Sequence, residues 1–216
     1  MAGITNAVNL IDGLDGLAGG MSVIVLVVIG SIAIIERRSD LLSIAFILAS
    51  GTLGFLIYNA HPASIFMGDC GSLFLGFMIS AISLLGFKSS TILTLALPIL
   101  LLMLPIIDTL SAILRRTLKG MKFMEADKSH IHHLLMRQFG HRNTVIIMCG
   151  LTSLFGLSAF AYMINRNIGF IVMIIILLSV ELFIEKSAMI SEKFHPLIGL
   201  WHRIQRKYKK ILRKVG

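Results

Sequence analysis

The sequence predicts an all-α fold, a polytopic membrane bundle of about six transmembrane helices with a basic amphipathic helix at its C-terminal end. Three observations predict it. Of the 216 residues, 56% are hydrophobic and 14% are charged, and the mean hydropathy is +0.88, whereas a soluble domain carries about 25% charged residues. Apolar runs of about 17 residues or more recur, and at about 1.5 Å per residue they can cross a hydrocarbon layer of about 30 Å. Lys and Arg are concentrated in two segments outside these runs.

Six apolar segments are expected to form the membrane helices. They cover residues 17–35, 41–58, 73–87, 91–114, 144–164 and 168–184. The third is short, so its helix is expected to begin inside the preceding polar segment. The fourth contains Pro98, Pro105 and Asp108, and an interior proline favours a kink that neighbouring helices can accommodate. Residues 1–184 are therefore predicted to form one transmembrane domain, and residues 185–216 a cytoplasmic tail.

Loop charges predict which face of the bundle is cytoplasmic. Residues 115–142 contain seven Lys or Arg and the tail after residue 184 contains nine, whereas the connections on the other side contain four. Because cytoplasmic loops carry an excess of positive charge, residues 115–142 and the tail are expected inside the cell. Counting helices backwards places residues 6–16 and 61–72 on the same face. Three polar loops should thus meet on the cytoplasmic side of a multi-pass cell-membrane protein.

The net charge of +9 is explained by these loops, so the expected partner is the lipid bilayer and no nucleic acid is expected. The tail repeats apolar residues at helical spacing opposite a basic face, which is typical of a helix lying on an anionic leaflet. A docking helix for a partner enzyme is the alternative. The two cysteines, Cys70 and Cys149, fit neither a disulfide framework nor a metal cluster.

The first polar motif, "NAVNLIDGLDGLAGG", starts at residue 6 and ends in the first predicted membrane helix. Its amide and carboxylate side chains recur every three residues, at Asn6, Asn9, Asp12 and Asp15. On an α-helix such a row fans across about half the circumference, and on a 3₁₀ turn it lines one face, so all four can point into one polar cavity. A solvated helix start accounts for one or two of these residues but not for four.

The second motif, "HPASIFMGDCGSLFLGF", covers residues 61–77 and ends in the third predicted membrane helix. Gly68, Gly71 and the free amides of a helix start suit anionic oxygens, and Asp69 beside them can hold a divalent cation. Ser72 follows three residues later. A helix-capping aspartate is the structural alternative, but the motif is expected on the same face as the first one.

The third motif, "ADKSHIHHLLMRQFGHR", covers residues 126–142 and contains His130, His132 and His133 among basic residues. A zinc site is conceivable, although a second set of ligands at a usual spacing is missing. Imidazoles and cations in one loop fit a phosphate-rich, anionic ligand better, and a solvated basic loop would not need three histidines. Carboxylates, a cation-binding aspartate and a basic histidine loop together indicate Mg²⁺-dependent phosphoryl transfer at a membrane surface.

In this order and spacing, "NAVNLIDGLDGLAGG", "FMGDCGSLFLGF" and "DKSHIHHLL" resemble the polyprenyl-phosphate N-acetylhexosamine-1-phosphate transferases, over essentially the whole chain. The H-I-H-H arrangement is more similar to the N-acetylglucosamine branch than to the muramoyl-pentapeptide branch, which has three consecutive histidines. The resemblance implies the branch that starts wall teichoic acid or related cell-wall glycans. Its substrates are UDP-N-acetylglucosamine and undecaprenyl phosphate, and its cofactor is Mg²⁺.

The resemblance also implies a reaction and a set of roles. The lipid phosphate attacks the β-phosphorus of the nucleotide sugar, and UMP leaves. Asp69 would hold Mg²⁺ with Asn9 as a second ligand, and Asp12 and Asp15 would line the nucleotide end of the cleft or assist the attack. The expected substrate-binding residues are Asn6, Gly68, Ser72, His130, His132 and His133.

Family members begin with further membrane helices and an Asp-Asp motif, and the sequence contains no Asp-Asp pair. The chain is therefore expected to be the C-terminal portion of such an enzyme, with a homodimer or a complementing N-terminal half as partner. A non-catalytic partner half is one alternative. A transporter subunit that uses Asp12, Asp15 and Asp108 as intramembrane ion sites is another.

Overall fold

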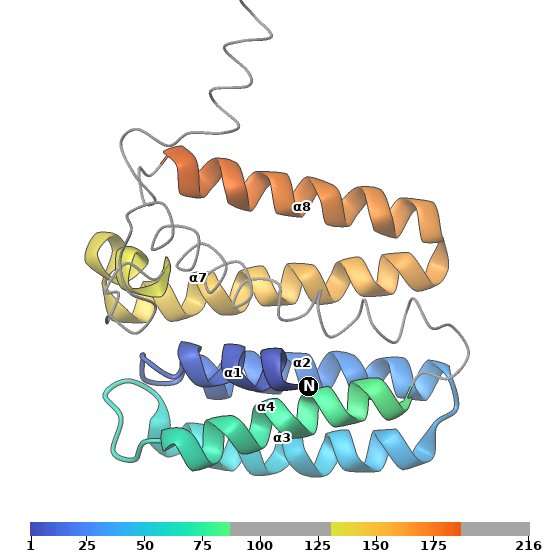
Figure 1. Cartoon of the computed structure of the whole chain (residues 1–216), viewed down its shortest axis with the longest axis horizontal. Helices are drawn as coiled ribbons and strands as arrows, with labels where there is room; N and C mark the ends of the chain where they lie inside the picture. The colour runs from blue at the N-terminus through green and yellow to red at the C-terminus, as the bar shows by residue number, and fades with distance from the viewer. Residues whose placement is uncertain (87–130, 187–216) are drawn as a thin grey trace, which may run out of the picture. The chain divides into compact units, whose positions relative to one another are not determined.

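The computed structural model describes residues 1–86 and 131–186, and these residues form helices joined by short loops (Figure 1). No strand occurs among them. The helices are α1 (Ala2–Ile11), α2 (Leu17–Ile35), α3 (Ser39–Asn59), α4 (Gly68–Gly86), α7 (Ile131–Ile164) and α8 (Arg166–Lys186). The chain divides into two compact units, residues 1–173 and 174–216, and the packing described below is that of the first unit.

The predicted membrane helices agree closely with those of the structure. Helix α2 has the predicted bounds, α3 is slightly longer, and α4 begins at Gly68 inside the polar segment, as expected. The fifth prediction, 144–164, is the later part of α7, which is interrupted at Gly140 (φ 77°, ψ 172°). The sixth, 168–184, lies within α8. The fourth, 91–114, and the predicted tail helix lie outside the described residues.

Length and composition support membrane insertion. Among the described residues, three helical segments are long and apolar enough to cross a membrane: Leu17–Ile35, Ser39–Asn59 and Leu135–Ile164. Shorter apolar segments accompany them: Ala2–Ile11, Gly68–Leu84 and Arg166–Val180. The protein is a polytopic membrane helical bundle, as its composition predicts.

Helix α2 is the centre of the first unit. It packs against α3, α4 and α7, and its fully buried side chains include Leu17, Met21, Ile29 and Ile32. Helix α3 instead buries one stripe, at Leu41, Ala45, Ala49 and Thr52. Its other faces carry exposed apolar side chains such as Phe46 (70% exposed), which suit contact with lipid and not with water.

Helices α1 and α4 approach so closely that a glycine is required between them. A Cβ atom on Gly76 would lie 2.8 Å from the Thr5 Cα atom, which is closer than side-chain carbons approach a backbone. Small residues allow membrane helices to pack backbone against backbone in this way. The contact sets the end of α1 beside the start of α4, where two of the predicted motifs lie.

Candidate active site

The end of α1 and the start of α4 are joined by polar side chains. The Asn9 Nδ2 amide donates hydrogen bonds to Asp69 Oδ1 (3.0 Å) and to Ser72 Oγ (2.8 Å). The buried Ser72 hydroxyl in turn donates to the Gly68 carbonyl oxygen at 2.9 Å. Gly68, at the first position of α4, has a φ of 64°, a conformation that glycine adopts without strain. We call Asn9, Asp12, Asp69 and Ser72 the oxygen cluster.

Asp12 lies at the C-terminal end of α1 and is partly buried beside Asp69. Burial, together with the negative charge of Asp69, raises the pKa of its carboxyl group to about 6, although a hydrogen bond from the Gly68 backbone N–H acts in the opposite direction. The Asp12 carboxylate is thus held near the Asp69 carboxylate in a partly desolvated environment. Such a pair is unfavourable when both groups are ionised, unless a cation lies between them.

The donor set of the oxygen cluster fits a hard divalent cation. Carboxylate, amide and hydroxyl oxygens are the ligands that Mg²⁺ and Ca²⁺ take, and Asp69 is exposed and available to a bound ligand. In the present arrangement the Asn9 amide donates its N–H groups to Asp69 and Ser72. Asn9 can offer its oxygen to a cation only if the amide turns over, and the two orientations of an amide differ little in shape.

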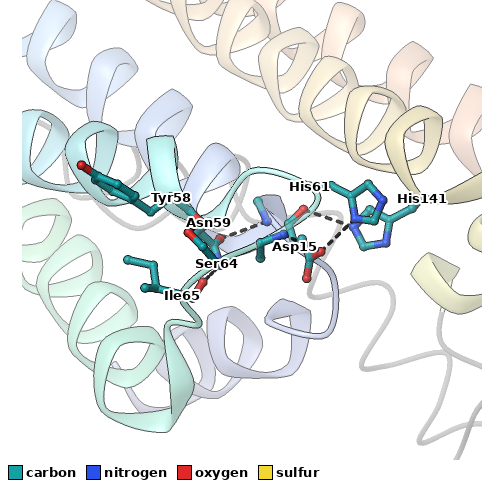
Figure 2. A network of polar contacts seen from close by, with 9 residues as sticks. Asp15, Tyr58, Asn59, His61, Ser64, Ile65 and His141 are labelled. Carbon is teal, nitrogen blue, oxygen red and sulfur yellow. Dashed lines mark hydrogen bonds and ion pairs between the residues drawn. The ribbon is translucent and has the colours of Figure 1, made fainter.

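Asp15 belongs to a second cluster, with two histidines. Its Oδ2 atom lies 2.8 Å from His61 Nδ1, and it also accepts a hydrogen bond of 3.2 Å from the Ala63 backbone N–H. His141 Nε2 lies 3.3 Å from the Asp15 carbonyl oxygen, and the rings of His61 and His141 stack at 4.1 Å between centroids. Figure 2 shows the three side chains converging from the α1–α2 turn, the α3–α4 loop and α7. We call these three residues the histidine cluster.

The hydrogen bond from His61 lowers the pKa of the Asp15 carboxyl group, although partial burial opposes this shift. The nearby Ala63 N–H and His141 also lower the pKa. The Asp15 carboxylate is therefore stabilised in its ionised form, in which it attracts cations and hydrogen-bond donors.

The turn that carries Asp15 is held by hydrogen bonds to Asn59, at the end of α3. The buried Asn59 side chain accepts a hydrogen bond from the Gly16 backbone N–H (3.0 Å) and donates one to the Ile65 carbonyl oxygen (2.9 Å) (Figure 2). Gly16 has a φ of 78°, which allows the chain to turn into α2. One amide thus ties the α1–α2 turn to the α3–α4 loop.

The structure divides the predicted row of four polar residues between the two clusters. Helix α1 ends at Ile11, so the row does not continue along one helix or one 3₁₀ turn. Asn9 and Asp12 join Asp69 and Ser72, whereas Asp15 turns to the histidines, and Asn6 is exposed on α1. The prediction that all four side chains face one cavity overlooked this helix end.

Of the predicted histidines, His130 lies outside the described residues, and His132 and His133 lie in the first turn of α7. Sequence reasoning missed His61 and His141, although both occur within the second and third motifs. The available signal was their position in polar loops expected on the same face as Asp15. A cavity of about 340 Å³ opens beside the histidine cluster, and Arg142 and Cys149 also line it.

These features define a class of protein: a membrane helical bundle in which carboxylates, amides and histidines from distant segments meet where helices end. Residues 1–87, which contain the whole oxygen cluster, match the family model described as Glycosyl transferase family 4. This part of the chain is therefore similar to members of that family.

Three similar proteins extend the match beyond residue 87. The chain is 43% identical over 211 residues, 96% of its length, to a probable undecaprenyl-phosphate N-acetylglucosaminyl 1-phosphate transferase of Bacillus subtilis, of which it covers 59%. It is 38% identical to a decaprenyl-phosphate N-acetylglucosaminephosphotransferase of Mycolicibacterium smegmatis, over 67% of the chain and 41% of that protein. It is 36% identical to a phospho-N-acetylmuramoyl-pentapeptide-transferase of Listeria welshimeri, over 70% of the chain and 46% of that protein. The chain thus spans about half the length of these relatives.

Proposed function

We propose that this chain carries the catalytic face of a transferase that moves N-acetylglucosamine 1-phosphate from UDP-N-acetylglucosamine to undecaprenyl phosphate, releasing UMP. The observation that carries the proposal is the bridge from Asn9 to Asp69 and Ser72, which joins two motifs separated by 60 residues into one oxygen cluster. The names of the relatives support a polyprenyl phosphate as acceptor. The product is expected to start wall teichoic acid or a related cell-wall glycan.

In the proposed reaction, an oxygen of the lipid phosphate forms a bond to the β-phosphorus of the nucleotide sugar. The bond from that phosphorus to the bridging oxygen breaks, and the electron pair leaves with UMP. The attacking phosphate is already an anion near neutral pH, so the main barrier is repulsion between two polyanions. Positioning and electrostatic stabilisation are therefore the contributions expected of the protein.

The oxygen cluster is suited to that task. Asp69 and Asp12 would hold Mg²⁺, with Asn9 as an additional ligand once its amide turns over. The cation supplies positive charge where the phosphates meet. Ser72 fixes Asn9 in place, and the start of α4 at Gly68 directs backbone N–H groups toward anionic oxygens.

We further propose that this face is cytoplasmic. Sixteen of the twenty Lys and Arg residues lie in residues 115–142 and in the tail after residue 184, and this bias orients such loops toward the cytoplasm, where nucleotide sugars are made. Asp15 would lie at the nucleotide end of the cleft, and His130, His132 and His133 would bind the nucleotide sugar. Asn6 is proposed to bind substrate only because it belongs to the same motif.

The transporter alternative is less well supported. It requires carboxylates inside membrane-spanning segments, whereas Asp12 and Asp15 lie in the turn between α1 and α2, and Asp69 lies in the first turn of α4. Asp108 lies outside the described residues.

The test is transfer of radiolabelled sugar phosphate from UDP-N-acetylglucosamine to undecaprenyl phosphate, in membranes of a strain without its own enzyme. The chain is expressed alone, and together with the part of the Bacillus relative that it does not match, because a separately encoded half can associate after insertion. In the expression condition that shows transfer, Asp69→Asn should lower UMP release by about 100-fold or more, because an interaction that stabilises charge in the transition state is lost.

Asp40→Asn is the matched control, because Asp40 is an exposed carboxylate in the first turn of α3, paired with Arg38. It should leave UMP release unchanged. Equal activity of the Asp69→Asn and Asp40→Asn variants would refute the assignment of Asp69, and absence of transfer in both expression arms would refute the proposed function of this chain.

A further inference from the structure

We propose that Asp15, His61 and His141 form a binding site for a divalent transition metal of the zinc class, separate from the oxygen cluster. The proposal does not depend on the transferase activity. It rests on three residues from three segments, each of which offers one ligand atom, with all three atoms within 4.8 Å of one another.

The chemistry of the donors selects the metal. Two imidazoles and one carboxylate are a common ligand set for Zn²⁺ and for related first-row ions, whereas Mg²⁺ prefers oxygen ligands only. The oxygen cluster contains no histidine. The α1–α2 turn thus contributes Asp12 to a set of hard oxygen ligands and Asp15 to a set that contains nitrogen.

Charge balance favours a metal over an ion pair alone. The Asp15 carboxylate is bonded to His61, whereas His141 lies against the Asp15 backbone carbonyl oxygen, and two protonated rings stacked at 4.1 Å would repel one another. Neutral imidazole is the form that coordinates metal. The Arg142 side chain also lines the adjoining cavity, so an additional proton on the rings would add to an already positive surface.

The carboxylate is positioned before any metal binds. The Ala63 N–H donates to Asp15 Oδ2, and the Asn59 side chain fixes the neighbouring Gly16 backbone (Figure 2). Outer contacts of this kind orient metal ligands and strengthen binding. Of the three ligands, Asp15 is thus the fixed one.

The histidines must move for the site to close. Ligands held at about 2.0–2.1 Å around a tetrahedral ion are about 3.3 Å apart, so a bound metal would replace the 2.8 Å hydrogen bond between His61 and Asp15, move the two atoms slightly apart and release the proton. The rings must also rotate out of their stack, so that both nitrogen lone pairs point at one ion. Rotation about the terminal torsion of histidine is easy, and His61 is exposed.

The site would keep an open coordination position. Three protein ligands leave the fourth position of a tetrahedral ion free, as in catalytic rather than structural zinc sites. The cavity of about 340 Å³ lies next to all three ligands, and Arg142 contributes positive charge to its wall. A water molecule or an anionic oxygen of a bound ligand would occupy that position.

The experiment is a Zn²⁺ titration of the full-length chain in lipid nanodiscs, in competition with a chromophoric chelator. His61→Gln and His141→Gln should each lower the affinity of one Zn²⁺ site by about tenfold or more, and excess Mg²⁺ should not displace the ion. The matched control is His202→Gln in the tail, which should leave the affinity unchanged. Circular dichroism of metal-free samples checks that each variant is folded.

A second variant identifies the ligand directly. In His141→Cys the metal should be retained, and the Co²⁺-substituted protein should gain a sulfur-to-cobalt charge-transfer band that neither the native chain nor His202→Cys shows. Equal Zn²⁺ affinity in the native, His61→Gln and His141→Gln proteins, or absence of the new band in His141→Cys, would overturn the proposal. Neither readout requires sugar-phosphate transfer, so failure of the proposed function would leave the result interpretable.

Discussion

The oxygen cluster and the histidine cluster meet at one short turn, and they shift the pKa of a carboxyl group in opposite directions. Asp12, beside Asp69, has a pKa raised to about 6, mainly by burial. Asp15, three residues later, has a lowered pKa because His61 donates a hydrogen bond to it. Environments that push neighbouring carboxyl groups apart in pKa are typical of sites in which the two groups have different roles. The comparison teaches that a repeated sequence pattern need not mean a repeated function.

The two clusters are also held by different forces. The oxygen cluster depends on the backbone-to-backbone approach of α1 and α4 at Gly76. The histidine cluster depends on the buried Asn59 amide, which ties two loops together. Substitutions at these two supports should therefore separate the clusters experimentally.

The largest effect is expected from Gly76→Val. The added carbons would collide with the Thr5 backbone, so α1 must move away from α4 and Asn9 must leave Asp69. Overpacking of this kind costs about 1–3 kcal/mol of the free energy of unfolding. Thermal unfolding in detergent should show the lower stability, and Mg²⁺-dependent UMP release should fall in parallel.

Gly54→Val is the control for that substitution, since a Cβ atom at Gly54 of α3 would meet nothing within 4 Å. If Gly76→Val and Gly54→Val had the same stability and activity, the close approach of α1 and α4 would not support the oxygen cluster. Zn²⁺ affinity should stay close to native in both variants.

A more local effect, confined to the histidine cluster, is expected from Asn59→Ala. The substitution leaves the buried Gly16 N–H without its acceptor, at a cost of about 1–3 kcal/mol, and frees the turn that carries Asp15. Zn²⁺ affinity should fall, while the Mg²⁺ concentration required for UMP release should change less. Ser43→Ala removes an exposed hydroxyl bonded within α3 and should change neither quantity; an equal loss of Zn²⁺ affinity in the two variants would contradict the role of Asn59.

The smallest effect is a pH dependence of stability in the metal-free protein. The folded pKa of Asp12, about 6, is above its ordinary value of 3.8, so between these values the folded state binds more protons than the unfolded state. Stability should therefore decrease as pH rises through this window. Asp15 has the opposite sign: its contribution is present above pH 3.8 and is lost as pH falls through its lowered pKa.

Thermal unfolding midpoints of native and Asp12→Asn proteins, measured from pH 4 to pH 7, check this prediction. The native midpoint should decline relative to that of Asp12→Asn as pH rises. A constant difference between the two proteins across this range would show that Asp12 does not titrate there.

Much of this architecture could be predicted from the sequence, because apolar runs and loop charges directly reflect the cost of burying polar groups in lipid. The bounds of α2 and the early start of α4 are examples. The membership of Asp12, Asp69 and Ser72 in a polar site was also predictable from their spacing and from the face assigned to their loops.

The pairing of side chains was not predictable in the same way. Helix α1 ends at Ile11, and this end decides which carboxylate meets which partner. His61 and His141 are 80 residues apart, and only the packing of α7 against α2 brings His141 to Asp15. A lone histidine in a polar loop carries no periodic signal, so sequence reasoning favoured the denser run at residues 130–133.

The most direct test of the division between the two clusters is pulsed electron paramagnetic resonance of Mn²⁺ that replaces Mg²⁺ in the active protein. Mn²⁺ accepts the same oxygen ligands, and coordinated imidazole nitrogen modulates its electron spin echo. With the histidine cluster first saturated with Zn²⁺, we predict a bound Mn²⁺ with no modulation from histidine nitrogen, lost in Asp69→Asn and unchanged in His61→Gln. Nitrogen modulation that disappears in His61→Gln would place the activating cation in the histidine cluster and contradict the account.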